Sequence, residues 1–306
     1  MIKNSQGIKI ITREFRGIVL ISLTMKILPE PGWDRLLRVL CAQQGTVLLL
    51  GSTDSGKTTL ARYLVEALVA RRLRTALIDA DIGQSGIGLP GTISMKVFRD
   101  QRDLEQFSSE RMTFLGFTSP SRVIPLMVSM TGRLTGLGRR RSETAVVDTT
   151  GLISGELGKA LKMAKIRAIR PAHIVAIQKE DELEHILSLI GDARIHRLKA
   201  SSAAKKRSAP SRRAYRKKKL EEYFRGQEQS NLVLDGSVVP FFYRGRAFHT
   251  GDRELRQGAV IGLNHHDDTI ALGIIEEIAG TTVFFRSPLR SLKGISRVIC
   301  GDMTVA

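Results

Sequence analysis

Residues 51–58, with the sequence GSTDSGKT, have the residue types and the spacing of a phosphate-binding loop, G-x-x-x-x-G-K-[ST]. In such a loop the glycines let successive backbone N–H groups point at phosphate oxygens, and the following helix adds the positive end of its dipole. We expect Lys57 to reach the β- and γ-phosphates of ATP, and the Thr58 hydroxyl to bind Mg²⁺. The residues predicted to bind the nucleotide are Gly51, Ser52, Thr53, Asp54, Ser55, Gly56, Lys57, Thr58 and Thr59.

Two carboxylates follow the next apolar segment, in the sequence DADIGQ that begins at Asp79. Asp81 is a candidate base that accepts a proton from an attacking hydroxyl, and Asp79 is a candidate to organise Mg²⁺ through water. Gln84 is a candidate to hydrogen-bond a substrate phosphate or base. Carboxylates at this place also cap helices, so a purely structural role is the alternative, for Asp79 more than for Asp81.

Residues 148–151 (DTTG) end another apolar segment and put hydroxyls and a tight turn at a strand end. Thr149, Thr150 and Gly151 are candidates to bind substrate close to the γ-phosphate. Asp148 is a rival to Asp79 and Asp81 for the carboxylate of the magnesium site. An ordinary strand end with a polar turn has the same composition, so this segment is a weak signal by itself.

Between residues 205 and 219 the chain has nine basic residues and no acidic one. A lid that closes over phosphates must be cationic and mobile, and an arginine beside a transferring phosphoryl group stabilises its charge. We expect such a lid at residues 199–226, with a solvated charge run or an RNA-binding patch as the alternative. Its candidate catalytic arginines are Arg207, Arg212, Arg213 and Arg216.

The central part of the chain predicts the scaffold that brings these strand ends together. Apolar segments interpreted as strands lie at residues 47–50, 75–78, 112–117, 144–148 and 173–177, with helices between them. This alternation predicts an α/β fold, a P-loop NTPase-type parallel sheet flanked by helices, which binds ligands beyond the carboxyl ends of its strands. The predicted units are residues 1–40 with short strands and a helix, 41–229 with the P-loop and lid, and a small β-rich domain at 230–306.

The amino-acid composition and net charge indicate what kind of molecule the protein binds. The chain has 306 residues, is 42% hydrophobic and carries a net charge of +18, so it can bury a core and is suited to a polyanion such as nucleic acid. No apolar run approaches the roughly 18 residues of a membrane span, and the cysteines, Cys41 and Cys300, have no metal-ligand spacing. We expect a cytoplasmic protein, and we expect Trp33 to pack on the face of a helix.

Together these residues resemble the P-loop polyribonucleotide 5′-hydroxyl-kinase family, which includes RNA kinases of mRNA 3′-end formation, tRNA splicing and pre-rRNA processing and compact archaeal members. The resemblance covers about residues 30–306, and its most specific part is residues 79–92 (DADIGQSGIGLPGT). It implies transfer of the γ-phosphate of ATP, with Mg²⁺, to the 5′-hydroxyl of RNA, with single-stranded DNA left open as a second acceptor. It names no protein partner for this chain.

Individual residues follow from the resemblance. The catalytic Asp of the family maps onto Asp81, and residues 149–151 look like the clasp that holds the 5′ nucleotide. The clasp usually ends in Trp, and here that position is Leu152, which offers no ring for stacking, so we expect weaker or less selective gripping of the terminal nucleotide.

Two other functions stay open at this point. A catalytically inactive ATP-binding scaffold of an RNA-processing complex is supported by Leu152 and opposed by the intact Lys57, Thr58 and Asp81. A GTPase or small-molecule kinase is supported only by residues 178–181 (QKED), which also suit the start of a helix. Residues 265–268 (HHDD) invite a metal site, but no further ligand completes it, and we expect an exposed turn.

Overall fold

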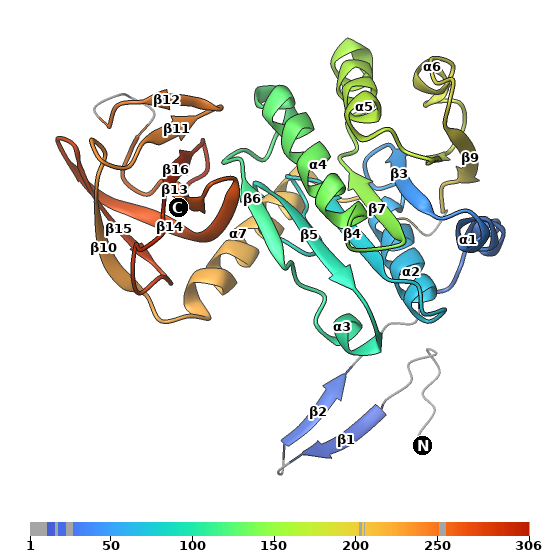
Figure 1. Ribbon diagram of the computed structural model, residues 1–306, viewed down its shortest axis with the longest axis horizontal. Coiled ribbons are helices and arrows are strands. Elements are labelled where there is room, and N and C mark those ends of the chain that lie inside the picture. Colours follow the sequence, from blue (N-terminus) through green and yellow to red (C-terminus); the bar gives the residue numbers. More distant parts are fainter. Residues whose placement is uncertain are drawn as a thin grey trace.

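The computed structural model describes residues 11–15, 18–22, 27–201, 204, 206–250 and 255–305 of the chain (Figure 1). It contains two seven-stranded sheets and a separate antiparallel pair of short strands, β1 (Ile11–Phe15) and β2 (Ile18–Ser22). Residues 1–10 of the predicted N-terminal unit lie outside the described residues. No helix in the described part of the chain is long and apolar enough to cross a membrane.

The first sheet is the predicted P-loop scaffold, with the strand order β6-β5-β4-β7-β3-β8-β9. Along the spatial order β4-β7-β3-β8-β9, neighbouring strands run parallel. Strand β5 runs antiparallel to both of its neighbours, β4 and β6. The carboxyl ends of the parallel strands therefore meet at one edge of the sheet, where the candidate residues follow them. The strands are β3 (Gly45–Gly51), β4 (Thr75–Ala80), β5 (Thr92–Phe98), β6 (Arg111–Phe114), β7 (Thr144–Thr149), β8 (His173–Gln178) and β9 (Arg194–Lys199).

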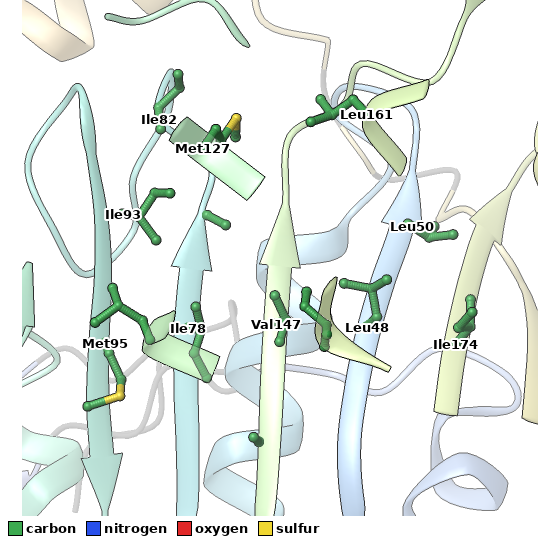
Figure 2. Packing of buried hydrophobic residues seen from close by; sticks show 14 of the residues in the cluster. Leu48, Leu50, Ile78, Ile82, Ile93, Met95, Met127, Val147, Leu161 and Ile174 are labelled. Carbon is green, nitrogen blue, oxygen red and sulfur yellow. The ribbon is translucent and has the colours of Figure 1, made fainter. Parts of the chain in front are cut away.

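Helices cover both faces of this sheet because its central strands are buried on both sides. Leu48, Leu50 and Val147 face one cluster, shown in Figure 2, which includes Met127 of α4 and Leu161 of α5. The alternate strand residues face a second cluster with α1 and α2, and Trp33 is buried there as predicted. The helices are α1 (Trp33–Ala42), α2 (Lys57–Val69), α4 (Ile124–Arg139), α5 (Gly155–Ile169) and α6 (Glu184–Leu187), with the 3₁₀ turn η1 (Pro120–Arg122) before α4.

Two strands of this sheet were not predicted. β5 has a clear alternating pattern, with Ile93, Met95 and Val97 in one core cluster, so the signal was present but overlooked beside the glycine-rich segment that precedes it. β9 (sequence RIHRLK) is an edge strand with little periodicity, because edge strands need no second buried face and commonly carry charge.

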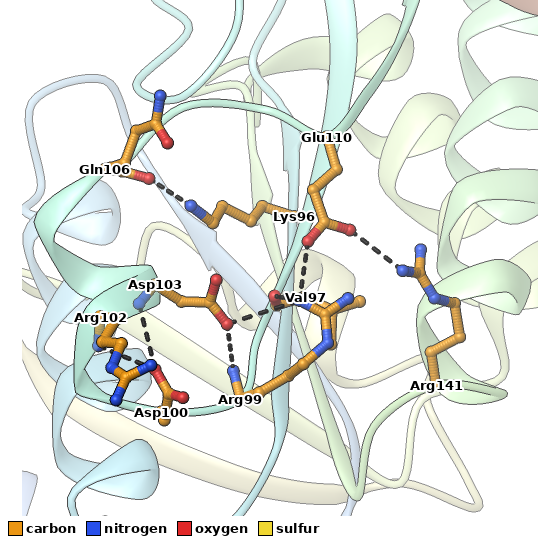
Figure 3. Close-up of polar contacts among 9 residues, drawn as sticks. All are labelled: Lys96, Val97, Arg99, Asp100, Arg102, Asp103, Gln106, Glu110 and Arg141. Atoms are coloured by element: carbon orange, nitrogen blue, oxygen red, sulfur yellow. Dashed lines mark hydrogen bonds and ion pairs between the residues drawn. The ribbon is translucent and has the colours of Figure 1, made fainter.

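A polar network fixes the segment that joins β5 to β6 (Figure 3). Arg99 pairs with Asp103 of α3 (Gln101–Glu105) and with Glu110, and Glu110 also pairs with Arg141 after α4. Exposed ion pairs each add little to the free energy of unfolding, so the network mainly sets the position of this segment.

The second sheet forms the β-rich C-terminal part, with the order β10-β15-β14-β13-β16-β11-β12 and its own apolar core. The HHDD segment lies at the β13–β14 turn, where His265 and His266 are exposed, as predicted. Its strands are β10 (Ser230–Asp235), β11 (Phe241–Tyr243), β12 (Arg246–Phe248), β13 (Val260–His265), β14 (Asp268–Ala279), β15 (Thr282–Ser287) and β16 (Arg297–Cys300).

The basic segment forms a helix, α7 (Ala209–Arg225), between the two sheets (Figure 1). The Ser208 hydroxyl caps it by accepting a hydrogen bond from the Ser211 N–H. Leu220 and Phe224 near its carboxyl end are buried in a cluster that contains residues of both sheets. The carboxyl end of α7 is thus part of the core, while its amino end extends to the phosphate loop.

Candidate active site

The phosphate loop connects β3 to α2, and Gly56 gives it the required backbone. Gly56 precedes the first residue of α2 with φ = 94°, a conformation that L side chains rarely adopt. The Lys57 ammonium is buried and donates a hydrogen bond to the Ser52 carbonyl oxygen at 2.7 Å, inside the loop. Burial lowers the pKa of Lys57, and the charges of Asp148 and Asp81 oppose this effect. Both carboxylates therefore lie near its ammonium group.

Thr58 and Asp148 form a direct pair at the centre of the site. The Thr58 hydroxyl donates a hydrogen bond of 2.6 Å to Asp148 Oδ2. Strands β3 and β7 are neighbours, so Asp148 near the end of β7 lies beside the start of α2, which follows β3. Burial and the nearby Asp79 raise the pKa of Asp148 to about 7, against the opposing effects of Lys57 and Thr58. A hydroxyl and a carboxylate in this arrangement are the donor set that holds Mg²⁺ in P-loop proteins.

Asp79 is buried and uses both of its oxygens inside its own loop. Its Oδ1 accepts a hydrogen bond from the Asp81 N–H, and its Oδ2 accepts from the Ser85 hydroxyl at 2.8 Å and the Gly86 N–H at 2.6 Å. Burial and the Asp81 charge raise the pKa of Asp79. Asp79 thus folds the segment that follows β4 back over the site, and Gly86 comes to lie beside Thr58.

Asp81 is half-buried, and the structure orients its carboxylate through one of the two oxygens. Its Oδ1 accepts hydrogen bonds from the N–H groups of Gly83 (3.0 Å) and Gln84 (3.2 Å). Its Oδ2 accepts none from the described residues. The carboxylate is therefore oriented by the backbone and still able to accept a proton.

The amino end of α7 contacts the phosphate loop through Asp54. The Arg207 N–H and the Arg212 guanidinium both donate to Asp54 Oδ2, at 2.9 and 2.7 Å. The Arg207 guanidinium also donates to the Gln84 side-chain oxygen at 3.0 Å. Burial raises the pKa of Asp54, but these hydrogen bonds outweigh it and hold the pKa below its usual value. Two of the four predicted arginines thus lie beside the phosphate loop and the Asp81 segment.

The other two predicted arginines, Arg213 and Arg216, also belong to α7. Arg213 is exposed, and Arg216 is half-buried. Burial lowers the pKa of Arg216, and the charges of Arg213 and Arg212 add to this effect. Neither has an ion-pair partner within the described ranges.

Two residues of α7 that we did not predict as site residues attach it to the Asp79 loop. The Tyr215 hydroxyl donates a hydrogen bond of 2.9 Å to the Ser85 carbonyl oxygen. The Lys219 ammonium donates to the carbonyl oxygens of Ser85 and Gly88, at 3.0 and 3.2 Å. Lys219 was counted only as part of a charge run, because nothing in a run of basic residues marks which of them meet backbone carbonyls.

The Thr149–Gly151 turn lies against the phosphate loop. The Thr149 hydroxyl donates a hydrogen bond of 2.8 Å to the Leu49 carbonyl oxygen in β3. Gly151 lies so close to Thr53 that a Cβ would overlap its backbone. Leu152, where the resemblance led us to expect Trp, is partly buried and packs against the core cluster that includes Met127 of α4 and Leu161 of α5.

Two fully buried lysines behind this turn also escaped the prediction. Lys162 and Lys165 lie on the inner face of α5 with Leu161 and Ile169. Their spacing relative to the apolar residues of that helix was a usable signal, because a lysine inside an apolar stripe needs an internal partner.

The QKED segment does not build a guanine-binding site in this structure. The Gln178 side chain donates to Glu184 and accepts from the Leu183 N–H, so it starts the turn that leads into α6. The alternative role of this segment, starting a helix, accounts for its composition.

Comparisons with known proteins agree with this geometry. Residues 51–226 match the model of the family described as mRNA cleavage and polyadenylation factor CLP1 P-loop. A polyribonucleotide 5′-hydroxyl-kinase of Pyrococcus abyssi is 38% identical over 214 residues, which are 67% of this chain and 59% of that protein. A polyribonucleotide 5′-hydroxyl-kinase of Methanocaldococcus jannaschii is 34% identical over 215 residues, 69% of this chain and 59% of that protein.

The fold agrees with a solved structure as well. Wild-type Clp1p, in a complex with a segment of Pcf11p, has a TM-score of 0.71 at 15% identity and covers 89% of this chain and 78% of that one. This likeness supports the fold alone, including the second sheet. The chain spans about six-tenths of the length of the two archaeal relatives.

Proposed function

Because the chain belongs to the mRNA cleavage and polyadenylation factor CLP1 P-loop family, we propose that it is an ATP-dependent polynucleotide 5′-hydroxyl kinase acting on RNA. The observation that carries the proposal is the Asp81 carboxylate beside the phosphate loop: two backbone N–H groups orient it, and its Oδ2 accepts no hydrogen bond from the part of the chain that the structure describes. A carboxylate with an oxygen available beside the phosphate loop is suited to accept the proton of an attacking hydroxyl. The net charge of +18 suits a nucleic-acid acceptor better than a small molecule.

The residues present fit ATP and Mg²⁺. Lys57 and the N–H groups of the loop would hold the triphosphate, and Gly56 has the backbone that this cradle needs. Thr58 and Asp148 would hold the metal ion, directly or through water. Asp79, which we expected in that role, folds the Asp81 loop instead, so our proposal gives the metal site to Asp148. When bound, Mg²⁺ neutralises charge on the β- and γ-phosphates.

The chemistry is a single phosphoryl transfer. A bond forms between the 5′-oxygen and the γ-phosphorus, the bond from that phosphorus to ADP breaks, and the hydroxyl proton moves to Asp81 Oδ2. Arg207 and Arg212 are the lid cations nearest the phosphate loop, and they would balance the charge of the transferring group. Arg213 and Arg216 would contribute to the electrostatic attraction of the RNA backbone, which weakens with salt.

The acceptor side is formed by the Thr149–Gly151 turn and Gln84. The turn lies against Thr53 of the phosphate loop, so an acceptor bound there would meet the γ-phosphate end of the nucleotide. Gln84 now accepts from Arg207 and could donate its amide to the acceptor. Leu152 packs against the core, so grip on the terminal base must come from contacts other than ring stacking at this position.

The test is transfer of labelled γ-phosphate from ATP to a 5′-hydroxyl RNA in the presence of Mg²⁺. We expect label on the 5′-hydroxyl RNA and none on the same RNA carrying a 5′-phosphate. Lys57→Ala should lower the rate about a hundredfold to a thousandfold, because a preorganised cation at the phosphates is removed. Wild-type protein that binds ATP but transfers no label would contradict the kinase and favour the ATP-binding scaffold.

A further inference from the structure

Helix α5 places two lysine ammonium groups inside the protein, behind the active site. The side chains of Lys162 and Lys165 are both fully buried, with 0% of their surface exposed. Burying a charged group is costly unless polar partners compensate it, so each of these residues must do something that an apolar side chain could not. Neither forms an ion pair with any residue that the structure describes.

Lys162 is connected to the acceptor turn. Its ammonium donates a hydrogen bond of 2.9 Å to the Thr149 hydroxyl and a second, short one to the Thr150 carbonyl oxygen. The Thr149 hydroxyl in turn donates a hydrogen bond to the Leu49 carbonyl oxygen in β3. The chain of contacts Lys162–Thr149–Leu49 therefore ties the turn to the strand that carries the phosphate loop.

Lys165, one turn further along the helix, faces a different part of the site. Its ammonium lies 3.5 Å from the carbonyl oxygen of Ala80, the residue between Asp79 and Asp81 in the sequence. Burial lowers the pKa of Lys165 to about 8, and the charge of Asp81 is the largest effect that opposes this shift. Both lysines are buried on the same helix, but Lys162 contacts the Thr149–Thr150 turn and Lys165 contacts the loop that contains Asp79 and Asp81.

We infer that Lys162 is a positioning residue for the acceptor: it fixes the Thr149–Thr150 turn beside the phosphate loop, so that the turn can bind the 5′ end of RNA. This rests on the proposed function for the identity of the acceptor. An apolar residue of the same size would leave the Thr150 carbonyl without its buried donor, and the turn would lose its fixed distance from β3. Lys162 itself touches neither the nucleotide loop nor the Asp81 carboxylate through any hydrogen bond among the described residues.

The experiment compares Lys162→Met with Lys159→Met, a control that removes a lysine of the same helix that is not buried, in the full chain. Affinity is measured for a short 5′-hydroxyl oligoribonucleotide with a nonhydrolysable ATP analogue present, and separately for the analogue alone. Lys162→Met should weaken RNA binding about tenfold and change analogue binding less than about twofold. Lys159→Met, which removes one positive charge from the same helix, should leave RNA affinity within about twofold of the wild type.

A second pair of variants covers the case in which Lys162→Met does not fold. Lys162→Gln retains a buried donor, and Thr149→Val removes one of the two acceptors of Lys162. If Lys162 and Thr149 act as one unit, the double variant Lys162→Gln/Thr149→Val should weaken RNA binding by less than the product of the factors measured for the two single variants.

Three results would overturn the inference: unchanged RNA affinity in folded Lys162→Met, equal losses in both lysine variants, or a loss of analogue binding as large as that of RNA. Binding is read without turnover, so the answer does not depend on catalysis. Wild-type protein that binds the RNA end but transfers no phosphate would contradict the proposed function and leave this inference standing.

Discussion

The phosphate loop and α7 both bring cations to the same place, but they hold them in different ways. Lys57 is buried at the start of α2 and fixed by the loop backbone that surrounds it. Arg212 reaches the site from α7, and Arg207 reaches it from the residues just before that helix. Asp54 accepts from the Arg212 guanidinium and the Arg207 N–H, and Gln84 accepts from the Arg207 guanidinium. The difference teaches that one set of charges is built into the core, whereas the other is kept by side-chain contacts that a substrate phosphate can replace.

The largest effect expected from this comparison separates the arginines of α7. Arg212→Ala should lower the rate of phosphoryl transfer about a hundredfold or more, because a cation near the transferring group is lost. Arg213→Ala, one residue away and exposed, should lower it less than about threefold. Initial rates at saturating ATP and RNA measure both. Equal losses in the two variants would mean that α7 acts only as a general basic surface.

A smaller effect is expected when the contact between the two regions is removed. Asp54→Asn removes the negative charge that Arg212 pairs with, so amides at residues 206–212 should exchange with solvent up to about fivefold faster. Asp34→Asn is the control, since Asp34 is a carboxylate that hydrogen-bonds Tyr63 on α2, away from α7. Unchanged exchange in Asp54→Asn would show that other contacts hold the amino end of α7.

The pH dependence of this contact follows from the direction of the Asp54 shift. The pKa of Asp54 in the folded protein is held below its ordinary value of 3.8, so the group is more easily ionised when folded. Its stabilising contribution is present above that ordinary value and is lost as the pH falls through the lower folded pKa. The ratio of the amide exchange rates at residues 206–212 in Asp54→Asn and in the wild type should therefore be constant across the neutral pH range.

The smallest effect concerns the anchor of α7 on the Asp79 loop. Tyr215→Phe removes one hydrogen bond to the Ser85 carbonyl oxygen, while Lys219 keeps its own bond to the same atom. We expect the free energy of unfolding to fall by about 1 kcal/mol and the transfer rate to stay within about twofold. Urea unfolding and initial rates measure the two quantities. A large loss of rate would place Tyr215 in the chemistry rather than in the anchor.

The sequence predicted the phosphate loop well because its function depends on residue types at fixed spacing. Gly56, Lys57 and Thr58 lie where a strand–loop–helix requires them. It also predicted that the segments after β3, β4 and β7 would meet, since parallel strands bring their carboxyl ends together.

Contacts between distant segments could not be predicted in this way. The partner of Thr58 proved to be Asp148, ninety residues away, and the sequence analysis had left Asp79, Asp81 and Asp148 as rivals. The division of labour between Asp79 and Asp81 depends on which loop N–H groups each accepts, and that is decided by the path of the backbone. The basic segment was expected to be mobile, but Leu220 and Phe224 fix the carboxyl end of α7 in the core.

The most direct test of the account is the rate of phosphate transfer to 5′-hydroxyl RNA by Asp81→Asn, with ATP and RNA saturating. The account predicts a loss of about a hundredfold to ten-thousandfold, with ATP affinity retained, because the amide keeps the shape of the carboxylate but cannot accept the proton. An Asp81→Asn protein that transfers phosphate at the wild-type rate would contradict the assignment of Asp81 as the base and with it the proposed mechanism.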